Sequence, residues 1–123
     1  MKIERFEDIE GWQLARELTR KVYRLTKKPG FARDYGLKRQ IQNASGSSMH
    51  NIAKGFDSET NAEFIRFLRY AKRSCTEVQS ELYVALDEKY ISPDELVLPF
   101  VDSSTISRNM KGSRQPTVNL TSE

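Results

Sequence analysis

The sequence predicts an all-α protein, an antiparallel up-down four-helix bundle whose fourth helix is shortened or irregular. Apolar residues recur at steps of three and four along most of the chain, which is the period of amphipathic helices. Two capping boxes, Thr60-Asn61-Ala62-Glu63 and Ser92-Pro93-Asp94-Glu95, mark helix starts. The length of 123 residues suits a single core, so we expect one bundle over residues 1–112 followed by a polar, disordered tail at 113–123.

The first predicted helix runs from about residue 6 to residue 28. Its apolar face repeats at helical steps and consists of Trp12, Ala15, Leu18, Val22 and Leu25. Lys27 and Lys28 suit the negative end of the helix dipole, and Pro29-Gly30 prevents the helix from continuing.

The second predicted helix covers about residues 34–56. Its apolar face consists of Leu37, Ile41, Ala44, Ser48, Ile52 and Phe56. The small residues 44–48 have poor helix propensity and would locally suit a loop. Because the apolar period stays in phase across them, we predict a continuous helix that a neighbouring helix approaches closely.

The third predicted helix begins at the capping box of Thr60 and carries the clearest pattern. Its buried stripe follows alternating steps of four and three over about three heptads: Phe64, Leu68, Ala71, Cys75, Val78, Leu82 and Ala85. This pattern predicts a long helix packed at a shallow angle against its partners.

The fourth predicted helix begins at Ser92 and follows a weak apolar period to about residue 110. Pro99 interrupts it, because a proline inside a helix removes a hydrogen bond and costs about 3 kcal/mol.

Composition excludes several classes of protein. No apolar run is long enough to cross a bilayer and the N-terminus lacks an apolar signal region, so we expect a cytoplasmic protein without a membrane partner. A single cysteine excludes an internal disulfide, and a single histidine, His50, excludes a di-iron site of the bundle type. Cys75 lies in the heptad core, where a cysteine behaves as a small hydrophobe. We therefore expect no enzyme, no metal and no cofactor.

Charge is unevenly distributed along the chain. Residues 1–50 hold 11 basic and 6 acidic side chains, whereas residues 51–100 hold 6 basic and 9 acidic side chains. Two interpretations stay open: a polarised surface that attracts a polyanion, or halves that attract each other within the fold.

Basic side chains recur on three predicted helix faces and are candidates for RNA binding. They are Arg16, Arg20, Arg24 and Lys28 on the first helix, Lys38 and Arg39 on the second, and Arg66, Arg69 and Arg73 around Tyr70 on the third. Such groups bind phosphates, and an aromatic ring can stack on an unpaired base. The alternative is that these faces are merely solvated and carry local ion pairs, such as Arg20 with Glu17 or Arg73 with Glu77.

Several motifs, in this order and spacing, resemble those of the bacterial four-helix bundle proteins encoded in intervening sequences of 23S rRNA genes. They are Phe6-Glu7-Asp8-Ile9 with Trp12-Gln13, Tyr35-Gly36-Leu37, Asn51-Ile52-Ala53-Lys54-Gly55-Phe56, and Glu63-Phe64-Ile65-Arg66-Phe67-Leu68. The resemblance covers about residues 3–98. Lys54 departs from it, because the family usually has Glu at that position.

The resemblance implies a ring-like homopentamer. A distant relative, the accessory protein of diversity-generating retroelements, binds RNA and a reverse transcriptase through a basic surface. We therefore expect a non-enzymatic homo-oligomer that binds RNA or a ribonucleoprotein partner, the alternative being a protein-interaction scaffold without a nucleic-acid role. The resemblance marks Trp12, Tyr35, Gly36, Asn51, Gly55, Phe56 and Phe64 as structural signature residues. Asn51 is expected to form hydrogen bonds between helices or between subunits.

Overall fold

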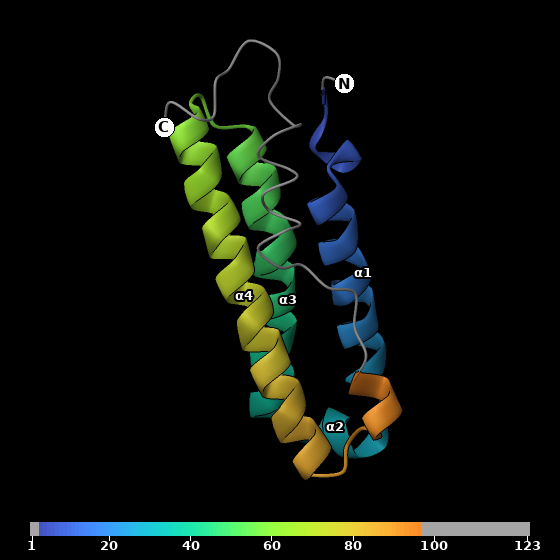
Figure 1. Ribbon diagram of the computed structural model, residues 1–123. Helices are drawn as coiled ribbons and strands as arrows, with labels where there is room; N and C mark the ends of the chain where they lie inside the picture. Colours follow the sequence, from blue (N-terminus) through green and yellow to red (C-terminus); the bar gives the residue numbers. More distant parts are fainter. Residues whose placement is uncertain (1–2, 97–123) are drawn as a thin grey trace.

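The computed structural model of the chain describes residues 3–96 (Figure 1). Over these residues the chain forms four α-helices packed against each other and no strand, which confirms the all-α prediction. The helices are α1 (Glu10–Leu25), α2 (Pro29–Arg33), α3 (Tyr35–Phe56) and α4 (Asn61–Asp87), with 3-10 turns η1 (Phe6–Asp8) and η2 (Pro93–Leu96). The predicted helix at Ser92 is described only as η2. Its continuation through Pro99 and the tail at 113–123 lie outside the described residues.

Three long helices, α1, α3 and α4, form the body of the molecule, with the short α2 between α1 and α3 at one end (Figure 1). Helix α3 packs against both α1 and α4. The hydroxyl of Thr19 on α1 donates to the carbonyl oxygen of Ser45 on α3 (2.9 Å), and the amide of Gln42 donates to the hydroxyl of Thr26 (3.0 Å). These contacts set the antiparallel register of α1 and α3.

The first helix is shorter than predicted at both ends. The backbone of Ile9 is extended (φ −76°, ψ 125°), so it separates the turn η1 from α1. At the other end the amide of Thr26 still donates to the carbonyl of Val22, after which the chain leaves the helix.

The short helix α2 is not among the elements that the sequence predicts, because Pro29-Gly30 indicates only the end of a helix. Pro29 in fact occupies the first turn of α2, where its missing amide hydrogen costs nothing. Phe31 is fully buried and stacks on Tyr90 (ring centroids 5.5 Å apart), and the Tyr90 hydroxyl donates to Asp34 (3.0 Å). The segment after α4 therefore holds α2 in place.

Helix α3 is continuous through the small residues 44–48, as predicted. Ser45 and Ser48 are fully buried, and their hydroxyls donate to the carbonyls of Gln42 (3.0 Å) and Ser45 (2.6 Å) within the same helix. A close approach to α4 lies further along, at Gly55, where an added Cβ would stand 2.7 Å from the Cβ of Phe67.

Helix α4 begins at the predicted cap, with the amide of Glu63 donating to the hydroxyl of Thr60 (3.1 Å). The Glu63 carboxylate pairs with Arg66 (2.7 Å) instead of returning to the Thr60 amide. At the second capping box it is the bond back from the glutamate that forms. The Ser92 amide donates to the Glu95 carboxylate (2.8 Å). All seven residues of the predicted α4 stripe are buried.

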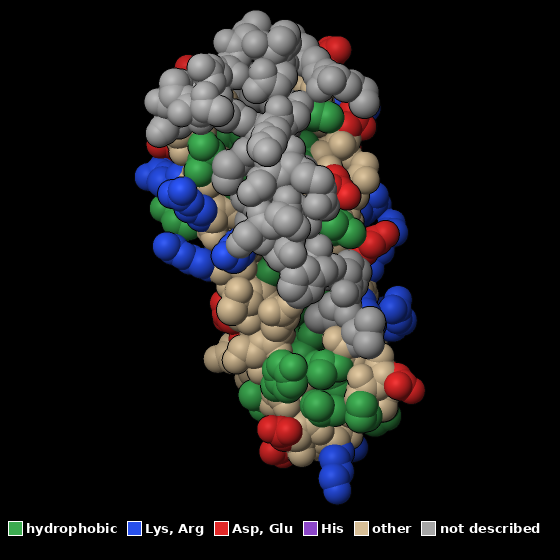
Figure 2. Space-filling view, viewed as in Figure 1, with side chains coloured by type: hydrophobic (Ala, Val, Ile, Leu, Met, Phe, Trp, Pro, Cys, Tyr) green, Lys and Arg blue, Asp and Glu red, His purple; other side chains and the backbone are tan. Residues whose placement is uncertain are grey.

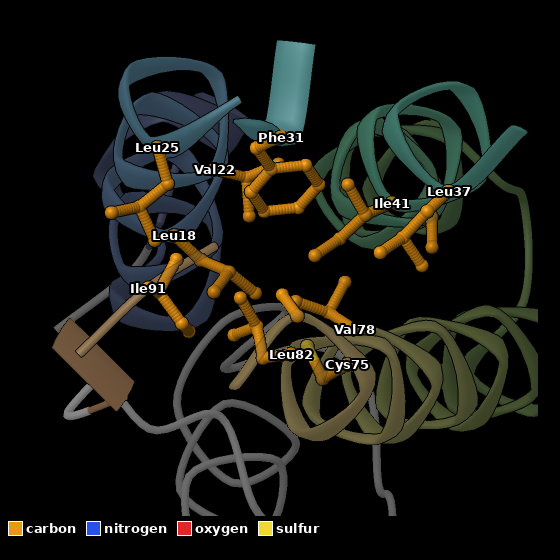
Figure 3. Close-up of a cluster of buried hydrophobic side chains, with 12 residues drawn as sticks. Leu18, Val22, Leu25, Phe31, Leu37, Ile41, Cys75, Val78, Leu82 and Ile91 are labelled. Atoms are coloured by element: carbon orange, nitrogen blue, oxygen red, sulfur yellow. The ribbon is translucent and has the colours of Figure 1, made fainter. Parts of the chain in front are cut away.

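The core consists of two clusters along the bundle. One lies toward α2 and joins α1, α3 and α4 through residues such as Leu18, Val22, Ile41, Val78 and Leu82 (Figure 3). The other lies toward η1 and contains Ile9, Ala15, Ile52, Phe64, Leu68 and Ala71. The apolar faces predicted from the sequence are therefore the ones that pack.

Candidate nucleic-acid interface

The first basic surface is the α1 ridge, defined here as Arg16, Arg20 and Arg24. All three side chains are exposed, and the guanidinium of Arg16 lies 5.7 Å from the centroid of the Trp12 ring. The ion pairs formed within the described part of the chain do not include the suggested pair of Arg20 with Glu17. The positive charge of the ridge is therefore available to an anion.

Lys28, predicted as the fourth member of this ridge, is engaged elsewhere. Its ammonium group pairs with the Glu95 carboxylate at 2.8 Å, and this contact joins the chain after α1 to η2. The hydrogen bonds from Lys28 and from the Ser92 amide lower the pKa of the Glu95 carboxyl. Lys28 thus contributes less to an anion-binding surface than the three arginines.

Lys38 and Arg39 lie in the first turns of α3, half-buried and exposed respectively. The antiparallel register places this end of α3 beside the C-terminal end of α1, which carries Arg24. These cations therefore extend the basic character at one end of the molecule.

The second basic surface is the cation–aromatic strip, defined as Lys54, Arg66, Phe67, Tyr70 and Arg73. The guanidinium groups of Arg66 and Arg73 lie 5.9 and 5.8 Å from the centroid of the Tyr70 ring. The Phe67 ring stands perpendicular to that of Tyr70, at 5.9 Å, and the ammonium of Lys54 lies 5.8 Å from the Phe67 centroid. Cations and rings alternate along the edge where α3 meets α4.

A third group of cations continues around α4. Arg69, Lys72, Arg73 and Thr76 line a surface hollow, and the three cations form no ion pair with another described residue. The suggested pair of Arg73 with Glu77 is therefore not formed. In Figure 2, Lys and Arg side chains lie along both edges of the view, on the α4 side and on the α1 side.

The surfaces predicted from the sequence did not include Lys54, Phe67 or Lys72. Lys72 stands three residues after Arg69 on the same helix face, so helical spacing alone would have found it. Lys54 and Phe67 come from different helices, and only the packing of α3 on α4 brings them together.

Several of the signature residues take part in packing. Trp12 contacts Phe6 edge-on (5.2 Å), and the fully buried Phe64 contacts Phe56 (6.4 Å). Gly55 permits the close approach of α4, whereas Tyr35 and Gly36 are exposed in the first turn of α3. Trp12, Gly55, Phe56 and Phe64 therefore take part in packing, whereas Tyr35 and Gly36 lie on the surface.

Asn51 takes part in a contact between helices through a neighbour. Its amide donates to the carbonyl and hydroxyl oxygens of Ser47 (2.9 and 3.0 Å), one turn earlier on α3. The Ser74 hydroxyl on α4 donates to the Ser47 hydroxyl (3.1 Å). The bond across the helices thus belongs to Ser47 and Ser74, with Asn51 holding Ser47.

The chemistry of Cys75 does not favour catalysis. The thiol is buried, and burial raises its pKa to about 11, although a hydrogen bond with Ser48 opposes the increase. The thiol is therefore protonated at neutral pH and a poor nucleophile. Among residues 3–96 no three His, Cys, Asp or Glu side chains gather where they would hold a metal ion.

None of the helices described is both long and apolar enough to cross a membrane.

Comparison with known proteins adds one finding. A family model described as 23S rRNA-intervening sequence protein matches residues 7–112, most of the chain. No curated protein matches the sequence.

Proposed function

Since the chain belongs to the 23S rRNA-intervening sequence protein family, we propose that it is a non-enzymatic, homo-oligomeric helical bundle that binds RNA, free or within a ribonucleoprotein. The contact is made by the basic faces of α1 and α4. One observation carries the proposal: Arg16, Arg20 and Arg24 on α1, and Arg69, Lys72 and Arg73 on α4, form no ion pair with a described carboxylate.

Unpaired cations on rigid helices suit a polyanion for a physical reason. Each phosphate that a protein neutralises releases condensed counterions, so affinity falls as salt concentration rises. A cation already bound to a carboxylate contributes little to this effect. The six cations that pair with no carboxylate of residues 3–96 therefore supply a salt-dependent attraction that the ion pairs of Lys28 and Arg66 do not.

The experiment replaces Arg16, Arg20 and Arg24 together by glutamine and measures RNA affinity at several salt concentrations. Loss of about three phosphate contacts should reduce the slope of log K against log salt by about 2 for a single strand. Because the three side chains are exposed, the helical circular dichroism spectrum should not change.

Lys28→Gln is the matched control, because the Lys28 ammonium already pairs with Glu95. Its slope should stay close to that of the unmodified protein. An unchanged slope in the triple variant would remove the α1 ridge from the interface.

A protein-interaction scaffold is the second candidate, and exposed apolar side chains favour it. Tyr83 and Val84, neighbours on α4, are 57% and 47% exposed. A scaffold of this kind would not retain RNA at physiological salt, whereas the proposed function requires that some binding survives there.

A further inference from the structure

We propose that the cation–aromatic strip binds unpaired nucleotides, with a base stacking on Tyr70 and the adjoining phosphates contacting Arg73 and Lys54, while Arg66 stays paired with Glu63. This inference rests on the proposed function and names the form of RNA that the protein prefers. It assigns to the α3–α4 edge a role different from that of the α1 ridge.

Cations and aromatic rings follow one another along the strip. Tyr70 is half-buried, with Arg66 and Arg73 on the turns before and after it on α4. Both guanidinium groups lie within 6 Å of the Tyr70 ring centroid, which is the range of cation–π attraction. Phe67 supplies a second ring against Lys54 and Arg66, at 5.8 and 5.7 Å. Proteins that bind single strands combine a positive surface with aromatic rings in this way.

Contacts within and between α3 and α4 hold the strip rigidly before any ligand binds. The hydrogen bond between the Ser74 and Ser47 hydroxyls (3.1 Å) ties α4 to α3 one turn beyond Tyr70. The close approach at Gly55 fixes the two helices on the other side, against Phe67. Glu63 holds Arg66 at 2.7 Å. A surface ordered in advance loses less conformational entropy on binding.

Single-stranded and double-stranded RNA differ in whether their bases are accessible to an aromatic side chain. Bases in an RNA duplex are stacked on each other, and the deep, narrow major groove does not admit side chains. An aromatic ring on a helix surface therefore stacks only on a base outside a duplex. The exposed groups of the α1 ridge are guanidinium groups, which contact phosphates in either form of RNA.

The experiment measures fluorescence anisotropy with a labelled single-stranded oligouridine and with an RNA duplex of the same length, at about 0.15 M salt. Tyr70→Leu removes the ring, and Tyr70→Phe retains it. A stacked base contributes about 1–3 kcal/mol, so Tyr70→Leu should weaken single-strand binding by roughly fivefold to a hundredfold. Duplex binding should change by less than about twofold, and Tyr70→Phe should retain the affinity for the single strand.

Tyr83→Leu is the matched control, because Tyr83 is an exposed tyrosine on the same helix without a cation over its ring in the described part of the chain. It should leave both affinities unchanged. Equal loss of single-strand and duplex binding in Tyr70→Leu, or no loss of either, would overturn the inference. Either result leaves the α1 salt test untouched, whereas the absence of all RNA binding would end both proposals.

A second measurement does not depend on the folding of a variant. Oligouridine containing 4-thiouridine is irradiated with the unmodified protein, and the crosslinked peptide is identified by mass spectrometry. The crosslink should map to Phe67 or Tyr70. Crosslinks confined to α1 would contradict stacking on this edge.

Discussion

Glu81 is a buried acid on α4, beside the heptad stripe and within one turn of Val78 and Ala85. Only 8% of the residue is exposed, and its Oε1 has no hydrogen-bond partner in the described structure. Burial, together with the hydrogen bond and the charge of Glu77, raises the pKa of its carboxyl to about 7. The folded protein therefore holds the Glu81 proton more tightly than the unfolded chain, whose carboxyl has a pKa of about 4.5.

The raised pKa of Glu81 predicts a stability that declines with pH. Because the folded state binds more protons than the unfolded state between about pH 4.5 and pH 7, the free energy of unfolding falls as pH rises through this window. Glu81→Gln imitates the protonated acid. It should match the unmodified protein in Tm near pH 4.5 and exceed it by several degrees at pH 8.

Thermal unfolding followed by circular dichroism at several pH values tests this expectation. Glu88→Gln is the control for removing one carboxylate from α4, since Glu88 is exposed at the C-cap of the helix. A Glu81→Gln protein whose Tm differs from that of the unmodified protein by the same amount at every pH would show that the acid is already ionised when folded.

At the residue scale, sequence reasoning found exposed cations but not their partners. Helical spacing suggested Arg20 with Glu17 and Arg73 with Glu77, and neither pair forms in the described chain. Lys28 instead pairs with Glu95, which is 67 positions away, and no local rule connects the two. Helical spacing identifies only those ion pairs whose two residues lie one turn apart. Which ion pairs form depends on how the elements pack.

At the element scale, the long helices were predictable and the short ones were not. The periods of α3 and α4 extend over many turns, so a weak stretch such as residues 44–48 does not hide them. Helix α2 has five residues, too few to show a period, and depends on the contact of Phe31 with Tyr90 from beyond α4. The small residues correctly indicated close packing, but the glycine that carries it is Gly55 and not Gly46.

Gly55→Ala should therefore destabilise the packing of α3 on α4. Its Cβ would stand 2.7 Å from the Cβ of Phe67 and 3.0 Å from Cδ1 of Phe64, so the packing of the two helices must shift there. Overpacking of this kind costs about 1–3 kcal/mol. The midpoint of chemical unfolding should fall, and RNA contacts of the cation–aromatic strip should weaken with it, because Phe67 belongs to that strip.

Gly46→Ala provides the matched control on the same helix. An added Cβ at Gly46 would meet the His50 ring at 3.6 Å, an ordinary contact. Alanine has a higher helix propensity than glycine, so this variant should gain up to about 1 kcal/mol. Two variants that shift the midpoint equally would show that α3 is not held at Gly55.

At the scale of the whole molecule, the two basic surfaces lie on different edges. One segment of RNA therefore does not have to contact both of them. The α1 ridge and the cation–aromatic strip belong to different helices, and α3 lies between those helices in the packing. In a homo-oligomer each surface would be repeated in every subunit. Weak contacts then add through effective concentration, and the gain is lost if the copies separate.

Native mass measured by light scattering tests this assembly, with absorbance read at 260 and 280 nm across the same peak. Five copies of the 14.2 kDa chain would have a mass of about 71 kDa. We expect that mass, with excess absorbance at 260 nm when the protein is purified in low salt and without it after washing in high salt. A peak near the mass of one chain would contradict the pentamer and remove the contribution of multivalency. In that case the affinity for oligouridine would have to come from one strip and one ridge, and Tyr70→Leu would abolish a larger share of it.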